Sequence, residues 1–577
     1  MILFPKLGLL ALITAACAHK RGESRASTFA GSTSTFQFPP PGLDTSVPDP
    51  DFPGPSAVGN AGPTPTGDEA FAVETAPAVP VIENESPVVR PDTSDRKGRK
   101  FDVIRSWGSL SPMFSLDRGT FGLPDASPLV PNGCTLKAVH ILHRHGARYP
   151  TLSDTGPSSF AAKINSAAAG AGFTATGPLA FLDTWILKLG AEILTPFGRQ
   201  QLYELGVNTR IRYGDLLKEA MGLPVWRTTS QERMVDSALQ FAAGFFGVQE
   251  FSTSYHQLIE IESSGFNSTL AAYDVCPNSN NAIGNFGHTQ AAKWASIYTA
   301  PIIKRLQPHI NGVNLTAVDI VAMQETCAYE SVALGFSSFC DLFTESEWGS
   351  FEYFFDLKFW YGNGPGNPTA AAQGIGYVSE VISRLTQTRI ANFDTSVNST
   401  IVSSDVTFPF GQPIFVDATH DTIISSVLVA LNLTGLASSG PLPTNRIKSN
   451  RQWVTSHIVP FATNLVAQAL SCPAPSNSHR PSSSPSPSGP TTHVRWILND
   501  AVVPLTGVEG CPSNRDGLCD LPTYVDGTQR RIAEVDYRFD CFSSYSIPVP
   551  DDILDGRFPP ALRNNATAPV GHVGARR

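Results

Sequence analysis

Seven consecutive residues, from Arg144 to Pro150, carry the strongest chemical signal in the sequence. They read Arg-His-Gly-Ala-Arg-Tyr-Pro and place His145 between the guanidinium groups of Arg144 and Arg148. Two arginines held together form a fork that matches the oxygens of a doubly charged tetrahedral anion such as phosphate. The imidazole between them is a nitrogen nucleophile located where the phosphorus atom would lie. The pattern predicts phosphoryl transfer to His145; the alternative is an exposed cluster of arginine and histidine.

The segment before this motif predicts a strand that holds it at the edge of a sheet. Val139 and Ile141 alternate with other residues as in a strand, and a glycine and a proline then end it. The side chains that follow would lie in the crevice at the carboxyl end of the strand. His143 shares a face with His145, so a metal site is conceivable, but no further ligand stands at a confirming spacing. We therefore expect no metal and place His143 in the lining of the pocket.

A second strand, turn and helix can bring an acid to the same place. Residues 414–416 form a short apolar run, and apolar residues at helical spacing follow Thr422 and stop before Gly435. His420 and Asp421 stand at the junction. A phosphoryl-accepting histidine needs a separate acid to protonate the departing alkoxide, and Asp421 can be that acid if bound phosphate raises its pKa. The alternative, a residue that only caps the helix, is disfavoured by the presence of the first motif.

A third cation stands at the start of another predicted helix. The segment from Arg227 to Arg233 opens a helix with an apolar face, which consists of Met234, Ala238, Leu239, Ala242 and Phe245. An arginine in the first turn of a helix makes a good oxyanion site, so Arg233 is a candidate phosphate ligand. We expect Arg227 to be structural, in a salt bridge.

Together with other segments, these motifs resemble the histidine acid phosphatases, the phosphohistidine branch of the phosphoglycerate mutase-like superfamily. Within that family they are similar to the fungal secreted phytases of the 3-phytase type. The other segments are Thr195–Gly198, Phe339–Thr344, Tyr361–Pro368, Gln373–Tyr377 and Val494–Asp500. The resemblance runs from about Cys134 almost to Cys541. It implies an α/β domain with an inserted, mainly α-helical domain, and helical patterns dominate between residues 155 and 370 in agreement.

The resemblance also implies a role for each candidate site residue. His145 would be the nucleophile and Asp421 the proton donor, while the phosphate ligands would be Arg144, Arg148, Arg233 and His420. With that many cations around the phosphate, we expect neither a cofactor nor a metal ion. Because Asp421 must be protonated to start the cycle, activity should favour acid pH.

The expected substrate is phytate, myo-inositol hexakisphosphate, because the resemblance is greatest to phytases. Fungal phytases line the approach to the site with lysines, whereas residues 151–164 here contain only Lys163. Lys358 is followed by Phe359 and Trp360, where phytases often have paired lysines. A broad acid phosphatase acting on small phosphomonoesters is therefore the alternative. A secreted member of the family that has lost catalysis is a third hypothesis, against which the complete set of site residues argues.

The amino-terminal part of the chain predicts export from the cell. Residues 1–18 combine a lysine, an apolar run and small residues as a secretory signal peptide does, and are too short to span a bilayer. Residues 19–100 are rich in Ser, Thr, Pro and Gly, which predicts disorder, with a removed pro-segment as the alternative. The rest, 101–577, is assigned to the phosphatase, with α/β parts at about 101–155 and 371–577, a helical insert at about 156–370 and a disordered loop at 473–490.

Cysteines and glycosylation sequons fit an extracellular or cell-wall location. Of nine cysteines, Cys17 leaves with the signal peptide, and the remaining even number predicts four disulfides. Spacing leaves the pairing open, and the resemblance implies Cys134–Cys472, Cys276–Cys541, Cys327–Cys340 and Cys511–Cys519. Asn-x-Ser/Thr sequons occur at Asn84, Asn267, Asn314, Asn398, Asn432 and Asn565.

The net charge limits the partners of the protein. A formal charge of −9 argues against nucleic acid and against an anionic membrane surface. Beyond the signal peptide, no stretch is long and apolar enough for a stable membrane anchor. The same charge opposes an anionic phosphomonoester at long range, so the site must supply its positive field locally.

Overall fold

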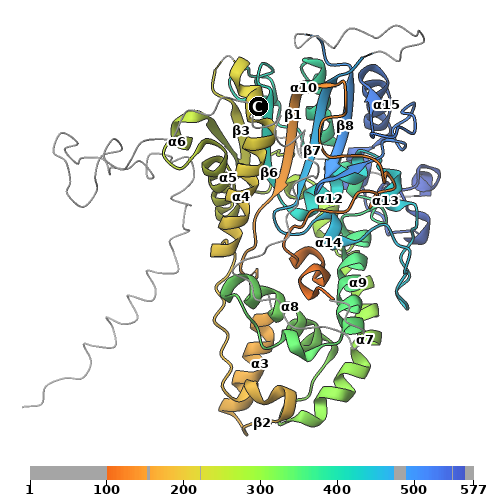
Figure 1. The fold of residues 1–577 in the computed structure, drawn as a ribbon. Helices are drawn as coiled ribbons and strands as arrows, with labels where there is room; N and C mark the ends of the chain where they lie inside the picture. Colours follow the sequence, from red (N-terminus) through yellow and green to blue (C-terminus); the bar gives the residue numbers. More distant parts are fainter. Residues whose placement is uncertain (1–100, 152–155, 221, 474–488, 549, 566–577) are drawn as a thin grey trace, which may run out of the picture.

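The computed structural model describes residues 101–151, 156–220, 222–473, 489–548 and 550–565 (Figure 1). The predicted signal peptide, the low-complexity segment 19–100, the sequon at Asn84 and most of the predicted loop 473–490 lie outside these residues. None of the described helices combines the length and the apolar character needed to cross a bilayer.

A mixed sheet runs through the upper half of the view in Figure 1. Its strands follow the order β10-β8-β7-β1-β6-β3-β4, and β9 pairs with β8. Strand β6 is parallel to β1 and β3, and β3 is parallel to β4, so four carboxyl ends meet at one edge. The strands are β1 Thr135–Arg144, β3 Val225–Thr229, β4 His256–Glu260, β6 Ile414–Thr419, β7 Asn464–Ser471, β8 His493–Leu498, β9 Ala501–Val503 and β10 Cys519–Asp520.

Helices cover both faces of this sheet. Successive side chains of β1 point to opposite faces, so they contact different helices. Val139 and Ile141 pack in one cluster with Leu202 and Phe241, which belong to α4 and α5. Leu142 belongs to the cluster on the other face, formed with α10, α12 and α15. A strand buried on both faces suits the parallel part of a sheet. The helices are α4 Pro196–Tyr213, α5 Glu232–Phe246, α10 Ala370–Thr386, α12 Asp421–Ala430 and α15 Leu521–Glu534.

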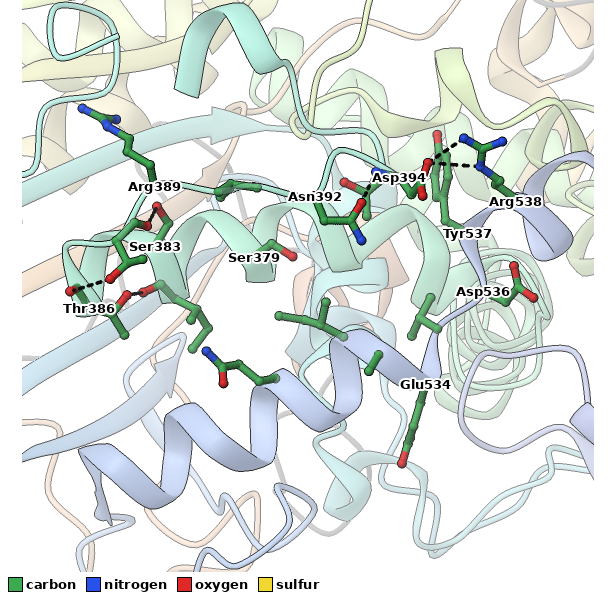
Figure 2. A pocket seen from close by; sticks show the side chains of 18 of the residues that line it. Ser379, Ser383, Thr386, Arg389, Asn392, Asp394, Glu534, Asp536, Tyr537 and Arg538 are labelled. Atoms are coloured by element: carbon green, nitrogen blue, oxygen red, sulfur yellow. Dashed lines mark hydrogen bonds and ion pairs between the residues drawn. The ribbon is translucent and has the colours of Figure 1, made fainter. Parts of the chain in front are cut away.

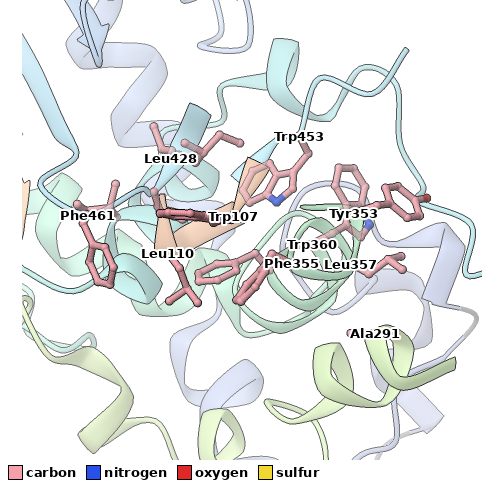
Figure 3. Packing of buried hydrophobic residues seen from close by; sticks show 14 of the residues in the cluster. Trp107, Leu110, Ala291, Tyr353, Phe355, Leu357, Trp360, Leu428, Trp453 and Phe461 are labelled. Carbon is pink, nitrogen blue, oxygen red and sulfur yellow. The ribbon is translucent and has the colours of Figure 1, made fainter. Parts of the chain in front are cut away.

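A second, mainly helical part occupies the lower half of the view in Figure 1. It consists of α3 Pro157–Ala169, α7 Phe286–Leu306, α8 Ala317–Leu334 and α9 Glu345–Gly362, with the short strands β2 Thr174–Ala175 and β5 Ile310–Asn311. Aromatic side chains hold α9 to the rest of the core (Figure 3). Trp360 meets Trp453 edge to face, and Gly108 lies so close to Phe355 that an added Cβ would be 2.4 Å from it. The segment that begins at residue 101 is thereby packed against α9.

The predicted fold class is confirmed, but the predicted limits of the helical insert, 156–370, are wrong in one respect. Strands β3 and β4 fall inside this range and belong to the main sheet, as do the helices α4 and α5 that cover it. The two strands are short, and β3 buries Arg227, Thr228 and Thr229 beside a single apolar side chain, that of Trp226. A strand whose buried groups are polar lacks the apolar pattern by which strands are recognised in a sequence.

The four predicted disulfides are confirmed: Cys134–Cys472, Cys276–Cys541, Cys327–Cys340 and Cys511–Cys519. The first joins the residue before β1 to the residue after β7, and the second joins residues 265 positions apart. Bonds between such distant residues restrict the unfolded chain strongly.

Candidate active site

The paired ends of β1 and β6 bring the first two motifs together. The strands are in parallel register with Arg144 opposite Thr419, and the backbone N–H of His145 donates to the carbonyl of Thr419 at 3.2 Å. The next residue on each side is a histidine, and the ring centroids of His145 and His420 lie 5.7 Å apart. The structure therefore places the His145 and His420–Asp421 motifs at one edge of the sheet, as predicted.

Two glycines allow the loop after β1 to pack against the start of α4. A Cβ on Gly146 would lie 2.1 Å from the carbonyl oxygen of Gly198, and one on Gly198 would lie 1.9 Å from that of Ala147. Neither distance is sterically possible, so any larger residue would push the loop away from the helix. Thr195 caps α4 by accepting from Gly198 N, and its own N–H donates to Ala147 O at 2.9 Å. This packing sets the direction of the chain between His145 and Arg148.

His145 is held as a neutral imidazole with one free nitrogen. Its Nδ1 lies 2.8 Å from the carbonyl of Gly146, which makes Nδ1 the protonated nitrogen and leaves the lone pair on Nε2. Burial, followed by the charges of Arg144, Arg233, Arg148 and His420, holds the pKa of His145 well below its usual value of 6.5. The same cations that would bind a phosphate thus keep this nitrogen unprotonated in acid.

Three arginines present unpaired N–H groups at this site. Arg144 donates to the carbonyls of Ser109 and Val459, Arg148 to that of Tyr149, and Arg233 to the carboxylate of Glu192. Within the described part of the chain, Nε of each arginine is nonetheless buried without a hydrogen-bond partner. Burial, together with Arg148 and Arg233, lowers the pKa of Arg144 to about 10, although Asp421 opposes this. Buried donors without acceptors are costly, and a bound oxyanion would satisfy them.

Asp421 faces Arg144 across the site. It is the first residue of α12, and its Oδ2 lies 2.7 Å from Nη2 of Arg144. Burial alone would raise the pKa of Asp421, but Arg144, Arg148 and His420 outweigh it and the pKa is lowered. The phosphate-free site therefore holds a carboxylate. The negative charge of a phosphate would counter the arginines and favour the protonated acid.

The site opens into a cavity of about 340 Å³ between the two parts of the molecule. Beyond Arg144, Arg148 and Asp421, its charged lining comes from Lys358 and Glu325, on α9 and α8. Burial lowers the pKa of Lys358 and raises that of Glu325. Apolar contacts are supplied by Leu110, Phe355 and Phe359. Lys163 is not part of this lining, because it pairs with Asp319 at 2.6 Å.

A larger cavity, of about 610 Å³, lies between α10, α15 and residues 388–395 (Figure 2). None of the predicted site residues lines it. Its charged side chains are engaged with protein groups: Arg538 with Asp394, and Arg389 with the carbonyls of Val402 and Phe408. Its size alone therefore does not make it the reactive centre.

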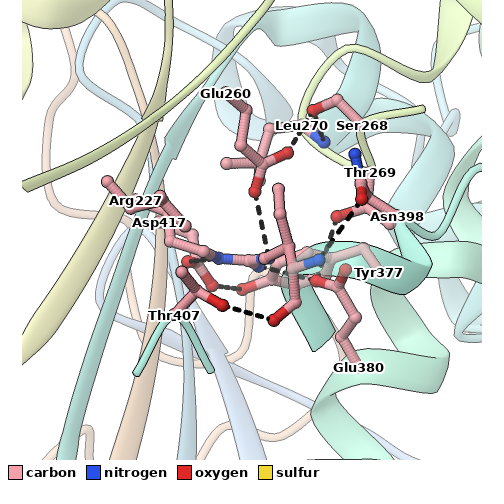
Figure 4. Close-up of polar contacts among 12 residues, drawn as sticks. Arg227, Glu260, Ser268, Thr269, Leu270, Tyr377, Glu380, Asn398, Thr407 and Asp417 are labelled. Carbon is pink, nitrogen blue, oxygen red and sulfur yellow. Dashed lines mark hydrogen bonds and ion pairs between the residues drawn. The ribbon is translucent and has the colours of Figure 1, made fainter. Parts of the chain in front are cut away.

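Two further predictions concern His143 and Arg227. His143 does not line the pocket: it is fully buried below the site and stacks on Phe241, with ring centroids 5.0 Å apart. Burial lowers its pKa to about 4, so it is neutral. Arg227 is structural as predicted, and its three nitrogens contact Asp417, Glu260 and Glu380 (Figure 4).

The sequence interpretation missed two carboxylates. Glu262 follows β4 and contacts His420, and Glu192 contacts Arg233. Neither belongs to a motif, and only the positive φ of Glu192 (69°) marks it as unusual once the structure is known. Among the described residues, no group of three or more His, Cys, Asp or Glu side chains is arranged to hold a metal ion. The absence of a cofactor stays a prediction.

Comparison with known proteins adds a family and a fold. The profile of the histidine phosphatase superfamily (branch 2) matches residues 135–499. Phytase A of Aspergillus fumigatus is 33% identical over 436 residues, which are 73% of this chain and 87% of the relative. Phytase A of Aspergillus awamori is 32% identical over 467 residues, 78% and 92% of the two chains. The crystal structure of the phytase from D. castellii has the same fold, with a TM-score of 0.61 at 24% identity over 79% of this chain and 92% of that one.

Proposed function

Because the chain belongs to the histidine phosphatase superfamily (branch 2), we propose that it is a histidine acid phosphatase that hydrolyses phytate through a phosphohistidine. One observation carries the proposal. Three arginines, each with a buried and unpaired Nε–H group, surround a neutral histidine, and the carboxyl group of Asp421 faces them. This set provides a nucleophile, charge stabilisation and a proton donor for the cleavage of a phosphate ester.

In the first step, Nε2 of His145 attacks phosphorus in line with the ester oxygen. The P–N bond forms as the P–O bond breaks, and the departing oxygen takes a proton from Asp421. Arg144, Arg148, Arg233 and His420 are the proposed ligands of the other phosphoryl oxygens. Each such donor is worth about 3 kcal/mol of transition-state stabilisation.

In the second step, water attacks the phosphohistidine. Asp421, now a carboxylate, accepts a proton from this water while the P–N bond breaks. Phosphate leaves and His145 returns to its neutral form. The low pKa of His145 keeps the nucleophile available in acid, where protonation of Asp421 is favoured.

Phytate as the substrate is supported by the relatives, which are named Phytase A. Lys358 and His288 add cationic or polar groups to the cavity wall, where further phosphates of an inositol ring would lie. A broad acid phosphatase is the second candidate, favoured by Phe359 in the lining and by the carboxyl group of Glu325. Attack at the 3-position of the ring, as in 3-phytases, is part of the proposal.

We propose that the enzyme is secreted, to the medium or the cell wall, and glycosylated. The four disulfides suit an oxidising compartment. Asn267 and Asn314 are exposed, and the amide of Asn267 donates to the carbonyl of Val397. The amides of Asn398 and Asn432 donate to the carbonyls of Asn267 and Gly507. The side chain of Asn565 lies outside the described part of the structure. Asn565 remains a proposed glycosylation site, as do the other sequons.

The test is a kinetic comparison of phytate with p-nitrophenyl phosphate, in acid and with a chelator present. We expect both esters to be hydrolysed and phytate to be preferred, with the 3-phosphate released first. Rapid quenching with radiolabelled substrate should place phosphorus on His145, and His145→Ala should abolish turnover while keeping the circular dichroism spectrum. An active His145→Ala variant, or a label on another residue, would contradict the mechanism.

A further inference from the structure

A carboxylate with an almost completely buried side chain lies inside the proposed phosphate site. The side chain of Glu262 is 2% exposed, and its Oε2 lies 3.0 Å from Nε2 of His420. Its Oε1 accepts from the amide of Gln231 and the hydroxyl of Tyr273. A negative charge this close to a phosphate opposes binding unless another group neutralises it, and buried charges are retained in proteins when they are paired.

Glu262 is ionised throughout the acid range. Burial alone would raise its pKa, but the charge of His420 and hydrogen bonds from His420, Tyr273 and Thr229 lower it to about 2. Burial and the neighbouring Glu262 raise the pKa of Tyr273 well above its usual value, so the phenol stays a donor to the carboxylate. The backbone N–H of Glu262 donates to Ser230 Oγ at 2.9 Å, which ties the residue to the segment that carries Arg233.

The contact with Glu262 sets which protons His420 carries. A carboxylate only accepts, so Nε2 of His420 must be the donor in this hydrogen bond. The structure shows no protein partner for Nδ1 among the described residues, and the ring lies edge-on to His145. If Nδ1 is to donate to a phosphoryl oxygen, both ring nitrogens carry hydrogen and the ring is a cation.

The other charges around His420 divide into two groups. Arg144 and Arg148, from the first motif, and Arg233, from α5, oppose a positive ring. Asp421 and Asp274 favour it, but Asp421 is paired with Arg144 at 2.7 Å, and in the described part of the structure Asp274 acts on the ring by its charge, without a hydrogen bond to it. His145 is neutral. Glu262 is thus the carboxylate in direct contact with this imidazole.

We propose that Glu262 is a positioning residue, which holds His420 as an imidazolium directed at the phosphoryl group. This inference rests on the proposed function and extends it by assigning a group that acts through His420 without touching substrate. The chain from carboxylate to imidazolium to phosphate also explains how a buried glutamate is tolerated beside an anion.

The test is Glu262→Gln, which keeps the size of the side chain and removes its charge. Without the carboxylate the imidazolium is disfavoured, so the alkaline limb of the kcat/KM profile should move to lower pH by about one unit. Inhibition by inorganic phosphate should weaken about tenfold at the pH optimum of the wild type. The matched control is Gln231→Met, which removes a neutral partner of the same carboxylate and should leave the limb in place.

A solely structural role would lower the melting temperature and the amount of active enzyme, without moving the pH limb or phosphate inhibition. An unshifted limb in an active Glu262→Gln variant would overturn the inference. If that variant does not fold, ¹⁵N-histidine NMR of the wild type decides, with His420→Asn to assign the signal. A doubly protonated His420 ring at about pH 5 supports the inference and a neutral ring overturns it. An inactive wild type would instead contradict the proposed function.

Discussion

Two buried clusters of charge lie along β6 and use the same residue types for opposite purposes. In the first, each nitrogen of Arg227 contacts a carboxyl group, from Asp417, Glu260 or Glu380 (Figure 4). In the second, at the end of the strand, the three site arginines each leave Nε without a partner in the described part of the chain. The pKa of Arg227 is raised well above its usual value, because the neighbouring carboxylates outweigh the effect of burial. The pKa of Arg144 is lowered, because burial outweighs its carboxylate neighbour, Asp421. A cluster with balanced charge holds strands together, and one with excess positive charge can bind an anion.

The protonation of Glu260 sharpens this comparison. Burial raises its pKa to about 7, so in acid it is neutral. The first cluster then contains two cations, Arg227 and Arg384, and two anions, Asp417 and Glu380. Its charge is balanced under the conditions in which the site would work, while the site itself keeps its excess of arginine.

The largest effect is expected from removing the central cation of the balanced cluster. Arg227→Met leaves buried carboxylates without their partner, which should lower the free energy of unfolding by about 4 kcal/mol. Chemical denaturation measures this change. The kcat of the molecules that remain folded should change little, because Arg227 does not reach the cavity.

The same substitution in the unbalanced cluster should have the opposite signature. Arg233→Met removes a proposed phosphate ligand and should cost about 3 kcal/mol of transition-state stabilisation, roughly a hundredfold in kcat/KM. Its melting temperature should stay near that of the wild type, because in the described part of the chain Arg233 pairs with a single carboxylate, that of Glu192. The distinction between the clusters would fail if Arg233→Met unfolded the protein. It would also fail if Arg227→Met abolished catalysis without lowering the stability of the protein.

A change of pH is expected to have a smaller effect on the stability of the protein. The pKa of Glu260 is higher in the folded protein than its ordinary 4.5, so its contribution to stability grows as pH falls from about 7 to 4.5. Asp417 has the reverse sign: burial alone would raise its pKa, but Arg227 and Arg384 lower it, so its contribution is lost only below its ordinary 3.8. The contribution of Glu260 to stability should therefore grow from neutral to mildly acid pH, while the buried histidines His140, His143 and His457, whose pKa values burial lowers, act in the opposite sense.

Glu260→Gln, which imitates the neutral acid, provides the control for this pH effect. Acidification should raise the melting temperature of the wild type relative to that of the variant, since one of the groups that take up a proton has been removed. An equal change in the two proteins would show that Glu260 makes no such contribution.

The smallest effect is expected from the one unpaired carboxyl group in the described lining of the cavity. Burial raises the pKa of Glu325, so it is ionised mainly towards neutral pH, where it would repel a substrate with several phosphates. Glu325→Gln should raise the ratio of kcat/KM on phytate to that on p-nitrophenyl phosphate severalfold, by about 1 kcal/mol, at neutral pH and less in acid. Lys358→Met should lower the same ratio. A ratio that Glu325→Gln leaves unchanged at every pH would remove Glu325 from substrate selection.

The local sequence pattern was sufficient to predict the elements that border a catalytic motif. The strand before Arg144, the strand before His420 and the helix that follows it were predicted from apolar spacing, and the structure has all three. The predicted range of the helical insert was too long, because β3, with its buried arginine and threonines, was not recognised as a strand. His143 was placed in the pocket, but the face of β1 on which it lies is covered by Phe241.

The sequence by itself determined which reactive groups stand side by side: an imidazole between two arginines, and a histidine next to an aspartate at the start of a helix. Such neighbours are set by the chain and by the geometry of a strand end. Only the tertiary structure decided the charge balance around each arginine, because the partners come from distant parts of the chain. Arg227 meets a carboxyl group 153 positions away, and His420 meets one 158 positions away. The physical reason is that burial makes each charge depend on every neighbour within a few ångströms, whatever their separation in the sequence.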